Sequence, residues 1–96
     1  MQKKDSEKDI ERELKKAVEK AGGLCIKFSS IFFTGMPDRF LFLPEGRFYM
    51  VELKSTSKTL EPRQKLVKKQ LSRLGFTVYV LDTFEKLNAF INTILK

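Results

Sequence analysis

The spacing of apolar and polar residues predicts short strands between amphipathic helices. From Ser6 to Ala21 apolar residues recur every three or four positions, as they do along one face of a helix. Several later runs are short and rich in aromatic and branched residues, which is typical of strands. The predicted order is helix 6–21, strands 24–29, 39–43 and 48–53, helix 61–74, strand 76–81 and a final helix after residue 83.

This order predicts an α/β domain with a mixed sheet. Helix 61–74 connects two strands by a crossover, so the last strand should pair parallel to its neighbour, whereas a hairpin joins strands 39–43 and 48–53. The 96 residues are enough for one small domain with a modest core, and we expect residues 1–96 to form a single unit.

The hairpin is predicted to bring two acids together. If Pro44-Glu45-Gly46 is a three-residue loop around a type I turn, with Gly46 in the left-handed conformation, Leu43 faces Arg47. The same register places Asp38 opposite Glu52, with Lys54 on the same face. A two-residue loop would instead put the two carboxylates on opposite faces.

Two adjacent carboxylates on a partly apolar face repel one another, and a divalent cation resolves that repulsion. Oxygen ligands suit Mg²⁺, and Mn²⁺ should substitute for it. The alternative is that Glu52-Leu53-Lys54 is simply the polar side of a half-buried strand, because motifs of this size are common by chance.

Composition narrows the possible functions. The formal net charge of +7 favours a polyanionic partner, although a membrane surface would also attract it. The absence of histidine excludes His-based acid–base catalysis, and the single cysteine, Cys25, is expected to be a packed small residue. With no apolar run of membrane-spanning length and no signal-peptide pattern, we expect a cytoplasmic protein.

Cationic residues gather on one side of the predicted helix 61–74, where they could follow a phosphate backbone or form a solvated face. Arg39, at the start of its strand, is a further candidate for nucleic-acid contact. The expected nucleic-acid-binding residues are Arg39, Arg63, Lys65, Lys68 and Lys69. The apolar run Ile31-Phe32-Phe33 could be core, a dimer contact or a wedge against DNA bases, in that order of preference.

The chain resembles the PD-(D/E)xK nucleases, and within them the small stand-alone VRR-NUC proteins often encoded by phages. The resemblance rests on Gly35-Met36-Pro37-Asp38, followed by Glu52-x-Lys54 and then by Gln64. The resemblance implies a restriction-endonuclease-like αβββαβ core with a C-terminal helix. It also implies that Gln64 lies beside the active site and that a glutamate of the first helix, Glu7 or in reserve Glu11, helps to complete the metal site.

We therefore expect Asp38, Glu52, Lys54 and Gln64 to form the catalytic site. The metal ligands would be Asp38, Glu52, the backbone carbonyl of Leu53 and Glu7. From the resemblance we expect a homodimer that cuts branched DNA, particularly four-way junctions, in a bacterium or a phage-infected cell, without an organic cofactor. The alternatives are a nuclease or nickase acting on flap or linear DNA, a catalytically silent nucleic-acid-binding module, and a structural protein.

Overall fold

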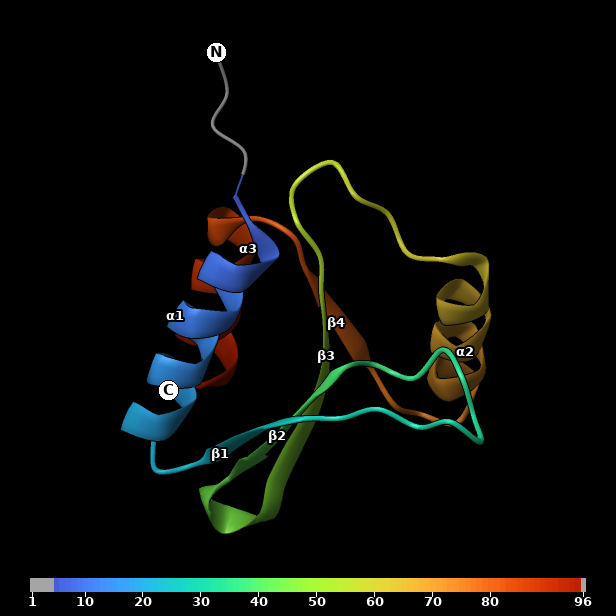
Figure 1. Cartoon of the computed structure of the whole chain (residues 1–96). Coiled ribbons are helices and arrows are strands. Elements are labelled where there is room, and N and C mark those ends of the chain that lie inside the picture. The colour runs from blue at the N-terminus through green and yellow to red at the C-terminus, as the bar shows by residue number, and fades with distance from the viewer. Residues whose placement is uncertain (1–4, 96) are drawn as a thin grey trace.

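The computed structural model describes residues 5–95 as one four-stranded sheet with helices on both faces (Figure 1). The elements are α1 Glu7–Lys20, β1 Leu24–Lys27, β2 Arg39–Leu43, a short 3-10 turn Pro44–Gly46, β3 Arg47–Leu53, α2 Pro62–Arg73, β4 Val78–Leu81 and α3 Phe84–Ile94. Every predicted helix and strand is present, with ends shifted by at most a few residues. No helix in the described range has the length and apolar composition needed to cross a bilayer.

The sheet is mixed, as predicted. Its strands lie in the order β1-β2-β3-β4; β1, β2 and β3 pair antiparallel, and β4 pairs parallel to β3. Helix α2 is the crossover between the two parallel strands. The arrangement is the αβββαβ core followed by a C-terminal helix.

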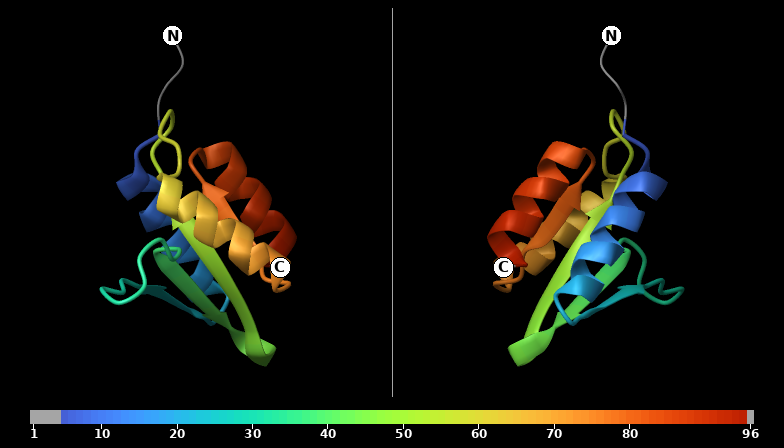
Figure 2. Two further views of the ribbon diagram at one scale, coloured as in Figure 1. Left: turned by 90° about the vertical axis from the view of Figure 1, so that its right-hand side faces the viewer. Right: turned by 90° about the vertical axis from the view of Figure 1, so that its left-hand side faces the viewer.

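One face of the sheet is closed by α1 and α3, which lie side by side in Figures 1 and 2. Helix α1 begins at Ser6, whose hydroxyl accepts from the Asp9 N–H at 3.1 Å, and α3 begins at Thr83, whose hydroxyl accepts from the Lys86 N–H at 3.0 Å. The buried side chains that meet between these helices and the sheet are Ile10, Leu14, Val18, Leu41, Leu43, Val51, Leu53, Leu81, Leu87, Phe90 and Leu95. This core fixes one face of the hairpin and leaves the other available for a site.

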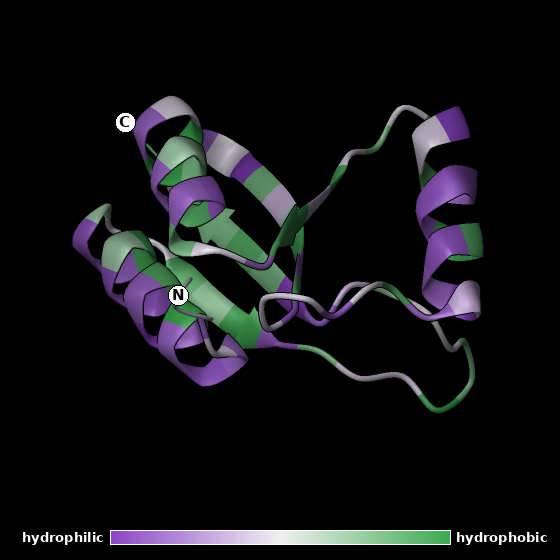
Figure 3. Cartoon of the chain, turned by 90° about the horizontal axis from the view of Figure 1, so that it is seen from above, coloured by the Kyte–Doolittle hydropathy of each residue, from purple (hydrophilic) through white to green (hydrophobic). Residues whose placement is uncertain are grey.

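Of the helices in the described part of the chain, only α2 covers the other face, and it does so in part. Figure 3 shows α2 on the opposite side of the sheet from α1 and α3. The sequence pattern predicts a packed side of Leu66, Val67, Leu71 and Leu74, but Val67 is the one fully buried residue of this helix, whereas Leu66 and Leu74 are exposed. That part of the prediction is wrong, because the short helix contacts the sheet along a narrow stripe.

The hairpin turn has the predicted length but a different backbone from the one expected. Glu45 as well as Gly46 has a positive φ, 67° and 71°, so the loop is not a type I turn with one left-handed residue. Leu43 still pairs with Arg47, which means that the three-residue loop sets the predicted register.

Gly35 fixes the loop 29–37, between β1 and β2, against α2. Its φ is +93°, and a Cβ there would lie 2.8 Å from Cγ of Arg63 and 2.9 Å from Cγ2 of Val67. We expect Gly35→Ala to lower the free energy of unfolding by about 2 to 4 kcal/mol, from backbone strain and overpacking together. Gly46→Ala is the control, because Gly46 has open space around it and should cost about 1 kcal/mol from strain. Equal losses in urea unfolding would contradict the close packing at Gly35.

Candidate active site

The register of β2 and β3 brings Asp38 and Glu52 onto the face that α2 partly covers. Arg39 pairs with Val51 and Phe40 with Met50, so Asp38, one residue before β2, lies opposite Glu52. Residues directly opposite one another share a face of the sheet. The structure therefore confirms the pairing on which the sequence prediction of a site depends.

Asp38 is held by the backbone of the neighbouring strand. Its Oδ1 accepts a hydrogen bond from the Leu53 N–H at 3.2 Å, and its Oδ2 lies 3.2 Å from Nη1 of Arg39. The carboxylate remains about 29% exposed, so it is fixed in position and still open to a ligand. The Leu53 N–H is thus used by Asp38, while metal binding by the Leu53 carbonyl stays a prediction.

Glu52 is a buried acid with an incomplete set of partners. It is 4% exposed, and its Oε1 is buried without a hydrogen-bond partner among the described residues. Burial, and then the negative charge of Asp38, raises the pKa of Glu52 to about 7. A buried carboxylate with an unpaired oxygen beside a second acid is the arrangement that a cation would stabilise.

Gln64 holds Glu52 from the first turn of α2. Its Oε1 accepts from the Glu61 N–H at 2.8 Å, and this contact turns the amide nitrogen of Gln64 toward Glu52. That nitrogen donates to Oε2 of Glu52, also at 2.8 Å. One side chain therefore caps α2 and orients the buried acid, which places Gln64 beside Glu52, as the family resemblance implies.

Lys54 completes the group on this face. Its Nζ lies 3.9 Å from Oε2 of Glu52, and its side chain is 16% exposed. Its own N–H donates to the Leu81 carbonyl at 3.2 Å, which fixes the backbone just beyond β3. An amine at this distance offsets part of the charge of the two acids and remains near enough to assist a reaction there.

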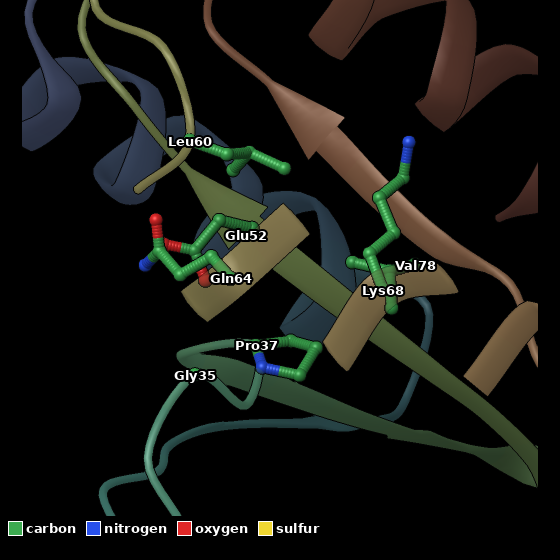
Figure 4. Close-up of a pocket in the computed structure, with 7 residues that line it drawn as sticks. All are labelled: Gly35, Pro37, Glu52, Leu60, Gln64, Lys68 and Val78. Carbon is green, nitrogen blue, oxygen red and sulfur yellow. The ribbon is translucent and has the colours of Figure 1, made fainter. Parts of the chain in front are cut away.

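A small cavity lies against Glu52, as Figure 4 shows. It is about 10 Å³, which is roughly the space for one water-sized particle. Its lining residues are Gly35, Pro37, Glu52, Leu60, Gln64, Lys68 and Val78. In Figure 4 the Lys68 amine points away from Glu52, so the unpaired Oε1 has no cationic partner there. The orphaned oxygen, the neighbouring Asp38 and the hard oxygen donors fit a divalent cation such as Mg²⁺.

Of the two candidate glutamates on α1, the structure connects Glu11 to the site. Glu11 forms an ion pair with Arg39, which in turn contacts Asp38, and the guanidinium holds the pKa of Glu11 below its usual value. Glu7 lies exposed in the first turn of α1. In residues 5–95, no three acids or cysteines cluster closely enough to hold a metal. The structure thus connects Glu11 to Asp38 through Arg39, while metal binding by Glu7, or by Glu11 in reserve, stays a prediction.

Arg39 does not lie where the sequence prediction put it. Its side chain is 3% exposed and lies between α1 and the sheet, so it has no surface to offer to nucleic acid. The signal was present in the sequence: Arg39 alternates with Asp38 and shares a face with Leu41 and Leu43, which are core residues. Arg39 is an internal counter-ion to Glu11 and Asp38.

Removing Glu11 should leave Arg39 buried with one acid instead of two. We expect Glu11→Ala to lower the free energy of unfolding by about 2 to 3 kcal/mol, below the usual loss for a fully buried pair because Glu11 is partly solvated. Glu13→Ala is the matched control on the same helix; its exposed pair with Lys16, at 3.6 Å, should be worth less than about 1 kcal/mol. Equal losses in urea unfolding would rule out the Arg39 connection as a stabilising contact.

Lys65, Lys68 and Lys69 are exposed on α2, as predicted. A surface hollow beside them is lined by Leu60, Lys65, Lys68, Lys69, Ser72 and Arg73. Leu60 and Lys68 line both this hollow and the cavity at Glu52, so the basic surface adjoins the acids. Arg63 has a different role, because its Nε donates to the Thr34 carbonyl at 3.1 Å and its guanidinium lies over Phe33.

Cys25 lies half-buried in β1, and burial raises the pKa of its thiol. A thiol with a raised pKa is a poor nucleophile at neutral pH. Its packing against the core agrees with the prediction that it is a small structural residue.

A mixed α/β sheet that presents two acids and a lysine beside a basic helix defines a nuclease-type domain. The comparisons agree. A family model of the VRR-NUC domain matches residues 3–85. The protein named "Putative nuclease p44" of Acyrthosiphon pisum secondary endosymbiont phage 1 is 39% identical over 77 residues, 80% of this chain and 83% of that protein.

A solved structure described as a VRR_NUC domain has the same fold, with a TM-score of 0.84 at 26% identity, and the match covers 94% of this chain and 98% of the other. The chain belongs to the VRR-NUC family. It is a nuclease of that family, and its substrate is nucleic acid.

Proposed function

We propose that this protein is a Mg²⁺-dependent, structure-selective DNA endonuclease that acts as a homodimer on branched DNA, with four-way junctions as its main substrate. The single observation that carries the proposal is the register that sets Asp38 opposite Glu52 on the face next to Gln64 and Lys54. The proposed reaction is hydrolysis of a phosphodiester bond, with water as the nucleophile.

Each residue has a role that its position supports. Asp38 and Glu52 would hold the cation, with the Leu53 carbonyl as a further ligand and Glu11 acting on Asp38 through Arg39. A bound Mg²⁺ would supply Lewis-acid stabilisation of the phosphate and lower the pKa of a water. Lys54 would orient the attacking water or offset the developing negative charge. Gln64 would keep Glu52 in the orientation that binding requires.

The basic hollow on α2 supports contact with the DNA backbone. Four cationic side chains line it, and it shares Leu60 and Lys68 with the cavity at Glu52. A phosphodiester chain lying in this hollow would pass directly by the acids. Contacts of this kind recognise backbone shape rather than base sequence, which suits a structure-selective nuclease.

The uncovered part of the sheet supports the homodimer. On the face that carries the site, α2 leaves Leu24, Ile26, Phe42 and Phe48 between 40% and 61% exposed. Among residues 5–95, strand β1 also forms an edge of the sheet, and its outer side could pair with another strand. A second copy related by a two-fold axis would cover this surface with the same surface of its own. A monomeric mass by light scattering, with no dimer on adding junction DNA, would contradict this part of the proposal.

A cleavage assay tests the proposed activity. Four-way junction, flap and linear duplex DNA of matched sequence are incubated with the wild-type protein in Mg²⁺, in Mn²⁺ and in EDTA. We expect paired cuts in the junction, slower cutting of the flap and duplex, and no cutting in EDTA. Equal cutting of all three substrates would point to a nuclease or nickase of broader specificity, and binding without cutting would indicate a silent nucleic-acid-binding module.

A further inference from the structure

Two large apolar side chains at the tip of loop 29–37 contribute nothing to the core. Ile31 is 84% exposed and Phe32 is 94% exposed, so the first of the three roles considered for this run, a place in the core, is wrong. Figure 2 shows the loop projecting beyond the sheet, on the side away from α3. Two adjacent large apolar side chains exposed at one point form a small apolar patch, and such patches mark interaction surfaces.

The two ends of the loop are fixed even though its tip is bare. At the base, the Phe28 N–H donates to the Asp38 carbonyl at 2.9 Å, and the Phe28 ring stacks on Phe40 with centroids 4.4 Å apart. On the other limb, Arg63 donates to the Thr34 carbonyl, and its guanidinium lies 5.2 Å from the ring centre of Phe33. The fold therefore holds the tip out from the site at a set position.

The tip lies close to the proposed cleavage site. Phe32 is four residues from Phe28, whose backbone touches that of Asp38, and four extended residues span at most about 14 Å. Base steps along a strand are about 3.4 Å apart. A base in contact with Phe32 would thus lie within about five nucleotides of the phosphate beside Asp38.

Charge decides between the two partners that remain for the tip, a second copy of the chain and nucleic acid. The loop is attached to α2, whose exposed face carries Lys65, Lys68 and Lys69, and the whole chain has a formal net charge of +7. A second copy placed here would set like charges against one another, whereas nucleic acid would be attracted. The bare part of the sheet, by contrast, is apolar and suits a second copy.

We propose that Ile31 and Phe32 form a wedge against unpaired bases at the branch point of DNA, with the Phe32 ring stacked on a base, while the phosphate to be cleaved lies beside the proposed cation site of Asp38 and Glu52. This inference rests on the proposed nuclease function and deepens it, because it names the feature by which branched DNA is distinguished from duplex. Every base offers a flat face to an aromatic ring, so such stacking recognises unpaired bases without reading their sequence.

The chain contains two tyrosines but no tryptophan, so Phe32→Trp places a single tryptophan, which can be excited selectively, at the tip. Asn92→Trp is the matched control, at an exposed position of α3 on the far side of the sheet. Each variant is titrated, without divalent cation, with junction, flap and intact duplex DNA. We expect branched DNA to quench the emission of Phe32→Trp at lower concentration than duplex does, and to leave the emission of Asn92→Trp unchanged.

Substitutions of Phe32 then distinguish aromatic stacking on a base from a simple apolar contact. We expect Phe32→Ala and Phe32→Leu to weaken binding of branched DNA about 5- to 150-fold, the usual effect of losing one stacked base, and Phe32→Tyr to retain wild-type binding. Wild-type affinity in Phe32→Leu would overturn the wedge. It would also be overturned if the emission of Phe32→Trp shifted with protein concentration in the absence of DNA, because the tip would then be a contact between copies.

Cleavage by the wild-type protein distinguishes failure of the wedge from failure of the proposed nuclease function. If the wild type cuts branched DNA in Mg²⁺ and the fluorescence of Phe32→Trp shows no response to that DNA, the wedge is wrong and the nuclease function stands. If the wild type cuts none of the substrates, the proposed function fails and the wedge fails with it.

Discussion

Glu52→Gln is expected to abolish cleavage and at the same time to make the protein more stable at alkaline pH. The change keeps the shape of a buried side chain and an acceptor for Gln64, but it removes the charge that would bind the cation. Losing a metal ligand costs several kcal/mol of transition-state stabilisation, which corresponds to at least about a 1,000-fold fall in rate.

The gain in stability follows from the pKa of Glu52. It rises from 4.5 to about 7 on folding, so the folded state holds this proton more tightly than the unfolded chain does. Raising the pH from about 4.5 to above 7 therefore weakens folding, by an amount on the order of 3 kcal/mol for this group. Glutamine cannot ionise, so the free energy of unfolding of the variant does not fall in this way as the pH rises.

The measurement is urea unfolding of the wild type and Glu52→Gln in EDTA at several pH values. Acids distant from Glu52 affect both proteins alike, so the difference between them reports Glu52 together with its interaction with Asp38. We expect a difference near zero at pH 4 that grows to about 3 kcal/mol at pH 8.5 in favour of the variant. Glu13→Gln, on the surface of α1, should show no such growth. A difference that does not change with pH would contradict the burial of a charged Glu52.

Asp38→Asn is expected to reduce cleavage by a similar factor, at least about 1,000-fold, for a related reason. Its amide oxygen can still accept the hydrogen bond from the Leu53 N–H, so the strand ends should keep their positions. The substitution removes the more exposed of the two acids and leaves Arg39 with Glu11 as its counter-ion. Loss of activity should therefore occur without unfolding.

The assay compares initial rates on junction DNA in Mg²⁺, with circular dichroism and urea unfolding as the check on folding. Glu45→Gln is the control, because Glu45 is an exposed acid in the turn at the far end of the same hairpin. Full activity in Asp38→Asn would exclude Asp38 as a ligand. A variant that has lost both activity and fold would be replaced by Lys54→Met, which should cost about 100- to 1,000-fold.

The pairing of the two acids was predictable because it depends on local chemistry. Pro44 and Gly46 mark the turn, the turn length sets the register, and the register fixes which residues share a face. The start of α2 at Glu61-Pro62 was predictable for a similar reason, since helix starts have a sequence signature, whereas the place of Gln64 beside the site was implied only by the family resemblance. The backbone of Glu45 was missed because a positive φ at a residue other than glycine has no such signature.

Features that depend on tertiary packing were predicted less well. The alternation along β2 puts Arg39 on the core face, whereas its positive charge favours a surface position. The burial of Arg39 depends on Glu11, an acid of α1 that is distant in sequence, and no local pattern shows this pairing. Leu66 and Leu74 repeat with helical spacing, yet the area that α2 covers depends on where the crossover places it. The exposure of Phe32 likewise follows from the loop being anchored to α2, which no local pattern shows.

Asp38 and Glu52 are proposed to share one divalent cation. Calorimetric titration with Mn²⁺ near pH 7, in two buffers of different ionisation enthalpy, measures this binding and the protons that it releases. We predict saturable binding to the wild type with release of about half a proton per ion, because Glu52, with a pKa of about 7, must be fully ionised to bind, and no binding to Glu52→Gln or Asp38→Asn. Wild-type affinity in either folded variant would contradict the claim.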